Sequence, residues 1–212
     1  MLIDISAVNE QLNSNGIAYL HGYHTEKDFA AICDYLGGTI STLDVKQDKS
    51  RSELVFGTQP IDFHTDSPAA DLIAWLCVNQ DECATLGAME FVDTFPISEH
   101  FSPKVLSILS NIKLQRRIKN TSQIETSYIV KLEEGKINIF YAPWLLPKNL
   151  GSEEENAIEC LKQFINSSKR TSIRMNPGDV VIIDNRRVLH GRAAISEQTT
   201  RHLMRAWIRR LP

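Results

Sequence analysis

The segment NPGDVVIIDNRRVLHGR, residues 176–192, decides the fold that we expect for this chain. A Pro-Gly-Asp turn leads into the apolar run VVIID, whose β-branched residues are typical of a buried strand. The apolar strand then delivers the imidazole of His190 near the end of the segment. This pattern indicates a β-sheet protein that carries a histidine where a strand ends.

A second stretch, FHTD at residues 63–66, places His64 and Asp66 two residues apart. Side chains at this spacing point to the same side of an extended chain, so both can reach one ion. Two histidines and one carboxylate on one face of a metal are the ligand set of non-haem Fe(II) oxygenases. Taken alone, such a tripeptide is more often a chance surface pair. Together with His190, it predicts a metal site.

A near copy of this motif, YHTE at residues 23–26, has an acid two positions after His24. Thr25 is a natural N-cap, and Glu26 would interact favourably with the helix dipole at a helix start. No downstream residues are spaced to complete a metal site with this copy. We therefore interpret YHTE as the start of a helix rather than as a ligand pair.

Two arginines follow His190 at positions 201 and 205. In a strand, Arg201, Leu203, Arg205 and Trp207 share one face, which directs both guanidinium groups toward one side. Buried guanidinium groups need anions, and their planar fork suits a carboxylate such as that of 2-oxoglutarate. The alternative is that both arginines pair with acidic side chains on the surface of an edge strand.

Four stretches carry helix signals. Two close on glycines, and one of these also has apolar residues at i, i+3, i+4 and i+7. The other two begin at an N-cap serine, followed either by proline or by a glutamate at capping-box spacing. The residues are Gly16 in the first stretch, Phe29, Ile32, Cys33, Leu36 and Gly37 in the second, Ser102 and Pro103 in the third, and Ser152 and Glu155 in the fourth.

Short runs rich in β-branched and aromatic residues, separated by turn residues, predict strands. They are residues 16–23, 53–57, 72–78, 87–92, 114–119, 171–176, 180–185 and 202–209, with a hairpin around EEGK within 127–142. The chain shows no βαβ alternation, which argues against a Rossmann-type sheet. We expect a mainly β fold of the α+β class, a sandwich or barrel with flanking helices on one side.

The segments that carry these motifs, residues 63–93 and 176–207, resemble the taurine dioxygenase and clavaminate synthase-like family of Fe(II)/2-oxoglutarate oxygenases. The resemblance implies a double-stranded β-helix, the cupin-like jelly roll. It implies His64, Asp66 and His190 as iron ligands, with 2-oxoglutarate and O2 as cosubstrates. It assigns Arg201 to the distal carboxylate of 2-oxoglutarate, and Arg205 to the cosubstrate or to an acidic group of the substrate.

Several further residues near these motifs are candidates for the site or its surroundings. Met89 stands where the family often has a threonine that contacts 2-oxoglutarate, so the sequence does not assign a hydroxyl contact there. Trp144 fits a core aromatic and a wall of the substrate pocket equally well. Asn185 and Arg192 flank the distal histidine, where both second-layer hydrogen bonds and turn geometry are plausible. His202 alternates away from Arg201 and is expected to be structural.

The bulk properties limit the class of protein. The 212 residues fit one domain, 1–212, with 42% hydrophobic and 23% charged residues. A net charge of −3 argues against a nucleic-acid partner, and no segment has the apolar length of a membrane span. The N-terminus lacks a signal-peptide pattern, so cytoplasm is the default location. The cysteines form no CxxC pair and are expected to be buried free thiols: Cys33, Cys77, Cys83 and Cys160.

The sequence thus predicts a dioxygenase that hydroxylates a C–H bond of a small polar substrate, such as an amino acid or its derivative. Desaturation or cyclisation by the same cofactor is one alternative. A catalytically inactive jelly-roll binding module is another. Little chain is available for a long lid after Asp66, so we expect an open pocket or one closed by a partner, and a homo-oligomer remains an option.

Overall fold

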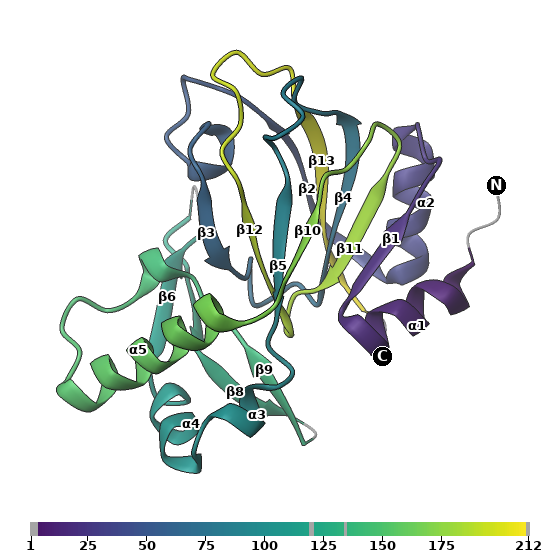
Figure 1. Cartoon of the computed structure of the whole chain (residues 1–212). Coiled ribbons are helices and arrows are strands. Elements are labelled where there is room, and N and C mark those ends of the chain that lie inside the picture. Colours follow the sequence, from purple (N-terminus) through teal and green to yellow (C-terminus); the bar gives the residue numbers. More distant parts are fainter. Residues whose placement is uncertain (1–3, 119–120, 134, 211–212) are drawn as a thin grey trace.

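The computed structural model describes residues 4–118, 121–133 and 135–210, and two antiparallel sheets face each other at its centre (Figure 1). The larger sheet has the order β1 (Ile17–Leu20), β11 (Val180–Asp184), β4 (Leu72–Asn79), β13 (His202–Arg209) and β2 (Gly38–Lys46). The smaller has the order β10 (Arg170–Ile173), β5 (Met89–Asp93), β12 (Val188–Arg192) and β3 (Ile61–His64). The mainly β architecture with flanking helices is as predicted.

Strand β4 shows how the sequence builds this double layer. Both faces of the strand are buried, which explains its continuous apolar run. Leu72, Ala74 and Leu76 pack toward the N-terminal helices, whereas Ile73, Trp75 and Cys77 pack between the two sheets. Ile73, Trp75 and Cys77 thus belong to the layer between the two sheets. The cavity described below opens in this layer.

Helices α1 (Ile5–Asn15) and α2 (Glu26–Leu36) cover the outer face of the larger sheet. Gly16 ends α1 in the left-handed conformation, at φ 70°, and Thr25 caps α2 by accepting from the backbone N–H of Asp28. The predicted apolar face of α2 is buried as expected. The HTE copy at residues 24–26 therefore begins a helix.

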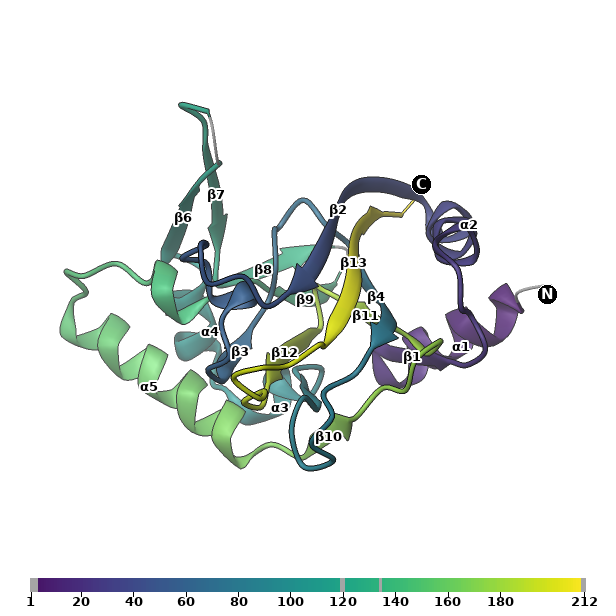
Figure 2. The same cartoon turned by 90° about the horizontal axis from the view of Figure 1, so that it is seen from above.

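The chain between β5 and β10 forms a second group of elements with its own apolar core. It contains α3 (Ile97–His100), α4 (Pro103–Leu109), β6 (Lys113–Arg117), β7 (Ile124–Tyr128), β8 (Val130–Glu133), β9 (Lys136–Ile139) and α5 (Ser152–Ser167). The β6–β7 hairpin projects away from the body of the molecule (Figure 2). The predicted EEGK hairpin is the β8–β9 pair, although Glu134 lies outside the described residues, as does Lys119 of the predicted strand 114–119.

Several sequence predictions were wrong in detail. The apolar strand expected to deliver His190 ends as β11 at Asp184, and His190 lies on the next strand, β12, of the other sheet. Residues 53–57 are not a strand, because Leu54–Phe56 form a 3-10 turn in which Phe56 N–H donates to the carbonyl of Glu53. The α5 cap lies one residue earlier than Ser152, since Glu154 accepts from the N–H of Gly151 at 2.8 Å. All four cysteines are free, but Cys83 is exposed and Cys160 is only partly buried.

Candidate active site

Sheet pairing brings the three predicted metal ligands together. His64 ends β3 and His190 lies in β12, and their Cα atoms are direct partners across the two strands. Asp66 follows in the loop after β3. One donor atom from each of the three side chains lies within 4.8 Å of the other two. Residues that are separated by more than a hundred positions in sequence thus form one compact donor set.

Each histidine is prepared to act as a neutral ligand. Nδ1 of His64 contacts the carbonyl oxygen of Asp62 at 2.7 Å, which directs Nε2 toward Asp66, 3.8 Å away. The ring of His190 packs against those of His64 and Trp75, with centroid distances of 4.2 and 5.0 Å. Burial lowers the pKa of both imidazoles below the usual value, so the neutral form that binds metals is favoured.

Asp66 is held by three neighbours. Its carboxylate accepts from Nη1 of Arg205 at 3.0 and 3.2 Å and from the indole N–H of Trp207 at 2.7 Å, while its backbone N–H donates to Asn185. Burial raises the pKa of Asp66, but the charge of Arg205, the two histidines and the Trp207 hydrogen bond outweigh it. The pKa falls to about 2, so the carboxylate is ionised at neutral pH.

These residues fit a divalent metal of the iron type. Two neutral imidazoles and one carboxylate are the donor set of non-haem iron sites, and they leave further coordination positions open. Nδ1 of His190 is buried and has no hydrogen-bond partner in the described chain. A buried polar atom of this kind is costly without a ligand or partner, which agrees with a site built to hold an ion.

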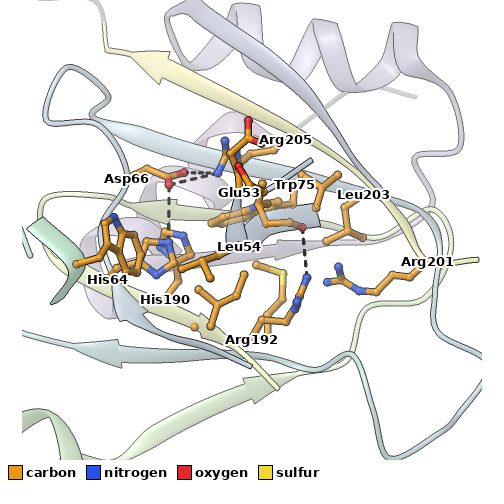
Figure 3. A pocket seen from close by; sticks show the side chains of 17 residues that line it. Glu53, Leu54, His64, Asp66, Trp75, His190, Arg192, Arg201, Leu203 and Arg205 are labelled. Carbon is orange, nitrogen blue, oxygen red and sulfur yellow. Dashed lines mark hydrogen bonds and ion pairs between the residues drawn. The ribbon is translucent and has the colours of Figure 1, made fainter. Parts of the chain in front are cut away.

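A cavity of about 450 Å³ opens beside the three ligands, between the two sheets (Figure 3). His64 and Asp66 lie at one end of it, and Arg192 and Arg201 lie toward the other. The wall between them is mostly apolar and includes Trp75, Met89 and Leu203. A small dicarboxylate can therefore reach the metal ligands and an arginine at once.

Both arginines at the far end of the cavity are buried. Arg201 is 3% exposed and donates from Nε to Oε1 of Gln80 at 3.2 Å. Arg192 is 8% exposed and donates from Nη2 to the carbonyls of Gly57 and Gln59, both at 2.7 Å. Arg201 lies on the face that the sequence predicted, together with Leu203 and Arg205.

The remaining residues singled out from the sequence are Trp144, Asn185 and His202. Trp144, from a 3-10 turn at Pro143–Leu145, is 49% exposed and lines the cavity with its ring 4.8 Å from that of His64. Asn185 positions Asp66 and also bonds the carbonyls of Ser67 and Ala70. His202 pairs with Asp44 away from the cavity, as expected of a structural residue.

The sequence interpretation missed some contacts. Arg205 was assigned to the cosubstrate or substrate, whereas the structure also pairs it with the metal ligand Asp66. The sequence did not predict the hydrogen bond from Trp207 to Asp66, although it predicted which strand face each of the two side chains occupies. Leu54 lines the cavity from a segment that was mistaken for a strand. Strand alternation shows which residues share a face, but it does not show which partner each residue contacts.

Comparison with known proteins identifies the family. The model of the family described as "Taurine catabolism dioxygenase TauD, TfdA family" matches residues 2–207. The chain belongs to this family. The resemblance read from the sequence is thereby confirmed for nearly the whole length of this TauD/TfdA-family protein. No curated protein matches the chain.

Several solved structures have a similar fold. An asparagine oxygenase in complex with Fe(II), 3-hydroxyasparagine and succinate has a TM-score of 0.77 at 14% identity, over 95% of this chain and 77% of that one. The non-heme iron oxygenase OrfP with Fe and alpha-ketoglutaric acid has a TM-score of 0.76 at 14% identity, over 97% and 78%. PvcB, an Fe, alpha-ketoglutarate dependent oxygenase from an isonitrile synthetic pathway, has a TM-score of 0.70 at 17% identity, over 97% and 80%. The jelly-roll expectation is confirmed.

None of the helices in the described ranges is both long and apolar enough to cross a membrane.

Proposed function

We propose that this TauD/TfdA-family protein is an Fe(II)- and 2-oxoglutarate-dependent dioxygenase, acting as one domain over residues 1–212, with His64, Asp66 and His190 as the iron ligands. The observation that carries the proposal is the donor set within 4.8 Å beside a cavity that contains buried Arg201. The three side chains would hold the ion and leave coordination positions to which one end of a 2-oxo acid would bind. Arg201 would bind the distal carboxylate of that cosubstrate.

When bound, iron with 2-oxoglutarate supplies the oxidising chemistry, in which dioxygen is consumed and the cosubstrate becomes succinate and carbon dioxide. The chain itself contributes the positioning of the reacting groups and the exclusion of water. Arg205 and Trp207 hold the Asp66 carboxylate, and Asp62 holds the His64 ring. The apolar wall disfavours water in the space between the metal ligands and Arg201.

We propose a small polar substrate, most simply an amino acid or amino-acid derivative, and hydroxylation as the reaction. The support is that two proteins of similar fold were solved with hydroxylated amino acids, 3-hydroxyasparagine and (3S)-hydroxy-L-Arg. The half-exposed ring of Trp144 lies against His64 and would form part of the substrate wall. Arg205 would then face an acidic group of the substrate from beside Asp66. Desaturation or cyclisation would use the same site. A cytoplasmic location belongs to the same proposal.

An anaerobic titration tests this function. Fe(II) and 2-oxoglutarate added together should give a visible charge-transfer band that neither produces alone. Succinate should then form in air with at least one member of a panel of amino acids, their carrier-bound forms and sulfonates. Tight iron binding without the band, and without succinate from any substrate, would instead support an inactive binding module.

A further inference from the structure

Two arginines face each other at the end of the cavity remote from the metal ligands. In Figure 3 the guanidinium groups of Arg192 and Arg201 point toward one another. Both side chains are buried, with Arg192 8% and Arg201 3% exposed. Arginine side chains carry a positive charge at neutral pH, so two positive charges share a site that is largely shielded from water.

The contacts of Arg192 leave part of its guanidinium group unused. Its Nη atoms donate to the backbone carbonyls of Val55, Gly57 and Gln59, which are neutral acceptors. Its Nε is buried and has no hydrogen-bond partner in the described chain. A buried N–H group left in this way is destabilising until an acceptor reaches it. Since the group belongs to a cation, an anion is the preferred acceptor.

The position of Arg192 on β12 determines how far this anion lies from the metal ligands. Arg192 is two residues beyond His190, so both side chains point into the cavity at a spacing of about 7 Å along the strand. A five-carbon dicarboxylate spans about 5 Å between its end carbons, given carbon–carbon bonds of about 1.5 Å. One carboxylate can therefore lie at the metal ligands while the other reaches Arg192.

Strand β5, one of the two neighbours of β12, provides no competing donor. Met89 of β5 is the Cα partner of Arg192 and also lines the cavity. Its thioether cannot donate a hydrogen bond. A carboxylate at this end of the cavity therefore cannot be held by Met89 and must be held by other groups.

We propose that Arg192 is a second cosubstrate-binding arginine, which holds the distal carboxylate of 2-oxoglutarate together with Arg201. This inference rests on the proposed function, since it concerns the same cosubstrate. Nε of Arg192 donates to one carboxylate oxygen, and the guanidinium group of Arg201 donates to the other. The bound carboxylate offsets the repulsion between the two cations. The pair of arginines therefore favours binding of a dicarboxylate over binding of a 2-oxo monocarboxylate.

The test compares two ligands on the iron-loaded protein under anaerobic conditions. Dissociation constants for 2-oxoglutarate and for pyruvate, which lacks the distal carboxylate, are measured by calorimetry on wild type and Arg192→Gln. Loss of a charge-assisted bond should raise the constant for 2-oxoglutarate about 10-fold to 100-fold. The constant for pyruvate should stay within about twofold.

Arg187→Gln is the matched control, because Arg187 is a partly buried arginine that also donates to backbone carbonyls but lies outside the cavity. It should lower the melting temperature without changing the ratio of the two dissociation constants. Arg192→Lys, which keeps the charge near the carbonyls of residues 55–59, serves if the glutamine variant fails to fold. It should weaken 2-oxoglutarate binding by a smaller factor and again spare pyruvate.

The outcomes separate two failures. If wild type binds 2-oxoglutarate but both Arg192 variants leave its affinity unchanged, or weaken both ligands equally, Arg192 only supports the 55–59 segment and the inference is wrong. If iron-loaded wild type does not bind 2-oxoglutarate, the proposed function fails, and the inference fails with it.

Discussion

The indole N–H of Trp207 donates to Oδ2 of Asp66 at 2.7 Å, and the guanidinium groups of Arg116 and Arg205 lie 5.3 and 5.1 Å from the centre of the Trp207 ring. This bond uses one oxygen of the carboxylate. The other, Oδ1, lies 3.8 Å from Nε2 of His64. Trp207 is therefore a positioning residue, which favours a fixed carboxylate orientation at the metal site.

Trp207→Phe should weaken metal binding. The phenyl ring keeps the packing against the two arginines but loses the N–H donor, so only Arg205 still holds the Asp66 carboxylate and its orientation is less fixed. We expect the dissociation constant for Fe(II) or Mn(II) to rise about tenfold or more. Anaerobic calorimetry measures it. Trp144→Phe is the control, because Trp144 contacts the His64 ring without a hydrogen bond to a ligand. Equal effects in the two variants would count against a role for the indole N–H.

The two similar motifs should respond differently to the loss of their histidines. His64→Ala removes a ligand and should abolish both iron binding and turnover. His24→Ala removes an exposed ring that packs on the turn at Gly178, and should cost about 1 kcal/mol of stability at most. Metal titration with thermal melting checks both variants. The opposite result would overturn the ligand assignment.

Gly191 separates His190 from Arg192 where β12 approaches β3 closely. A Cβ atom there would lie 2.8 Å from the backbone oxygen of Ile61, so Gly191→Ala must displace β3 and with it His64. We expect a loss of about 1–3 kcal/mol in the free energy of unfolding, together with weaker metal binding. Gly38→Ala, at a site with open space, should change neither quantity. Denaturant unfolding and metal titration provide the comparison.

Asp81 anchors the loop that follows β4 and should make stability depend on pH. Burial raises its pKa, but hydrogen bonds from Ser196 and from the N–H of Cys83 outweigh this and lower it from 3.8 to about 2. Since the folded-state pKa is depressed, its contribution is complete above about pH 4 and is lost as the pH falls toward 2.

Asp81→Asn should therefore lower the free energy of unfolding by about 2 kcal/mol at pH 7. It should also reduce the loss of stability between pH 4 and pH 2. Urea unfolding at several pH values measures both effects. Glu10→Gln, on the exposed face of α1, should leave the pH profile unchanged. A variant profile parallel to that of wild type would show that Asp81 is not responsible.

The local sequence was informative wherever one face of an element is buried. The apolar positions of α2 were recognisable because burial of one helix face imposes a period, and the run of β4 was recognisable because burial of both strand faces makes it continuously apolar. Strand β2 was missed for the same reason, since eight of its nine residues are exposed or only partly buried. The strand predicted for residues 53–57 was wrong because the apolar run there forms a 3-10 turn instead of an extended chain.

The sequence by itself determined the ligand types and the shared face of Arg201 and Arg205, because alternation along a strand is a local property. It did not determine the strand that carries His190, since the predicted apolar strand ends as β11 at Asp184 and His190 lies on the separate strand β12. Tertiary structure alone decided which groups meet. Pairing of β3 with β12 put His64 opposite His190, and the facing of the two sheets brought Arg192 to Arg201 and Trp207 to Asp66. These contacts join segments far apart in the chain, and local periodicity contains no information about such partners.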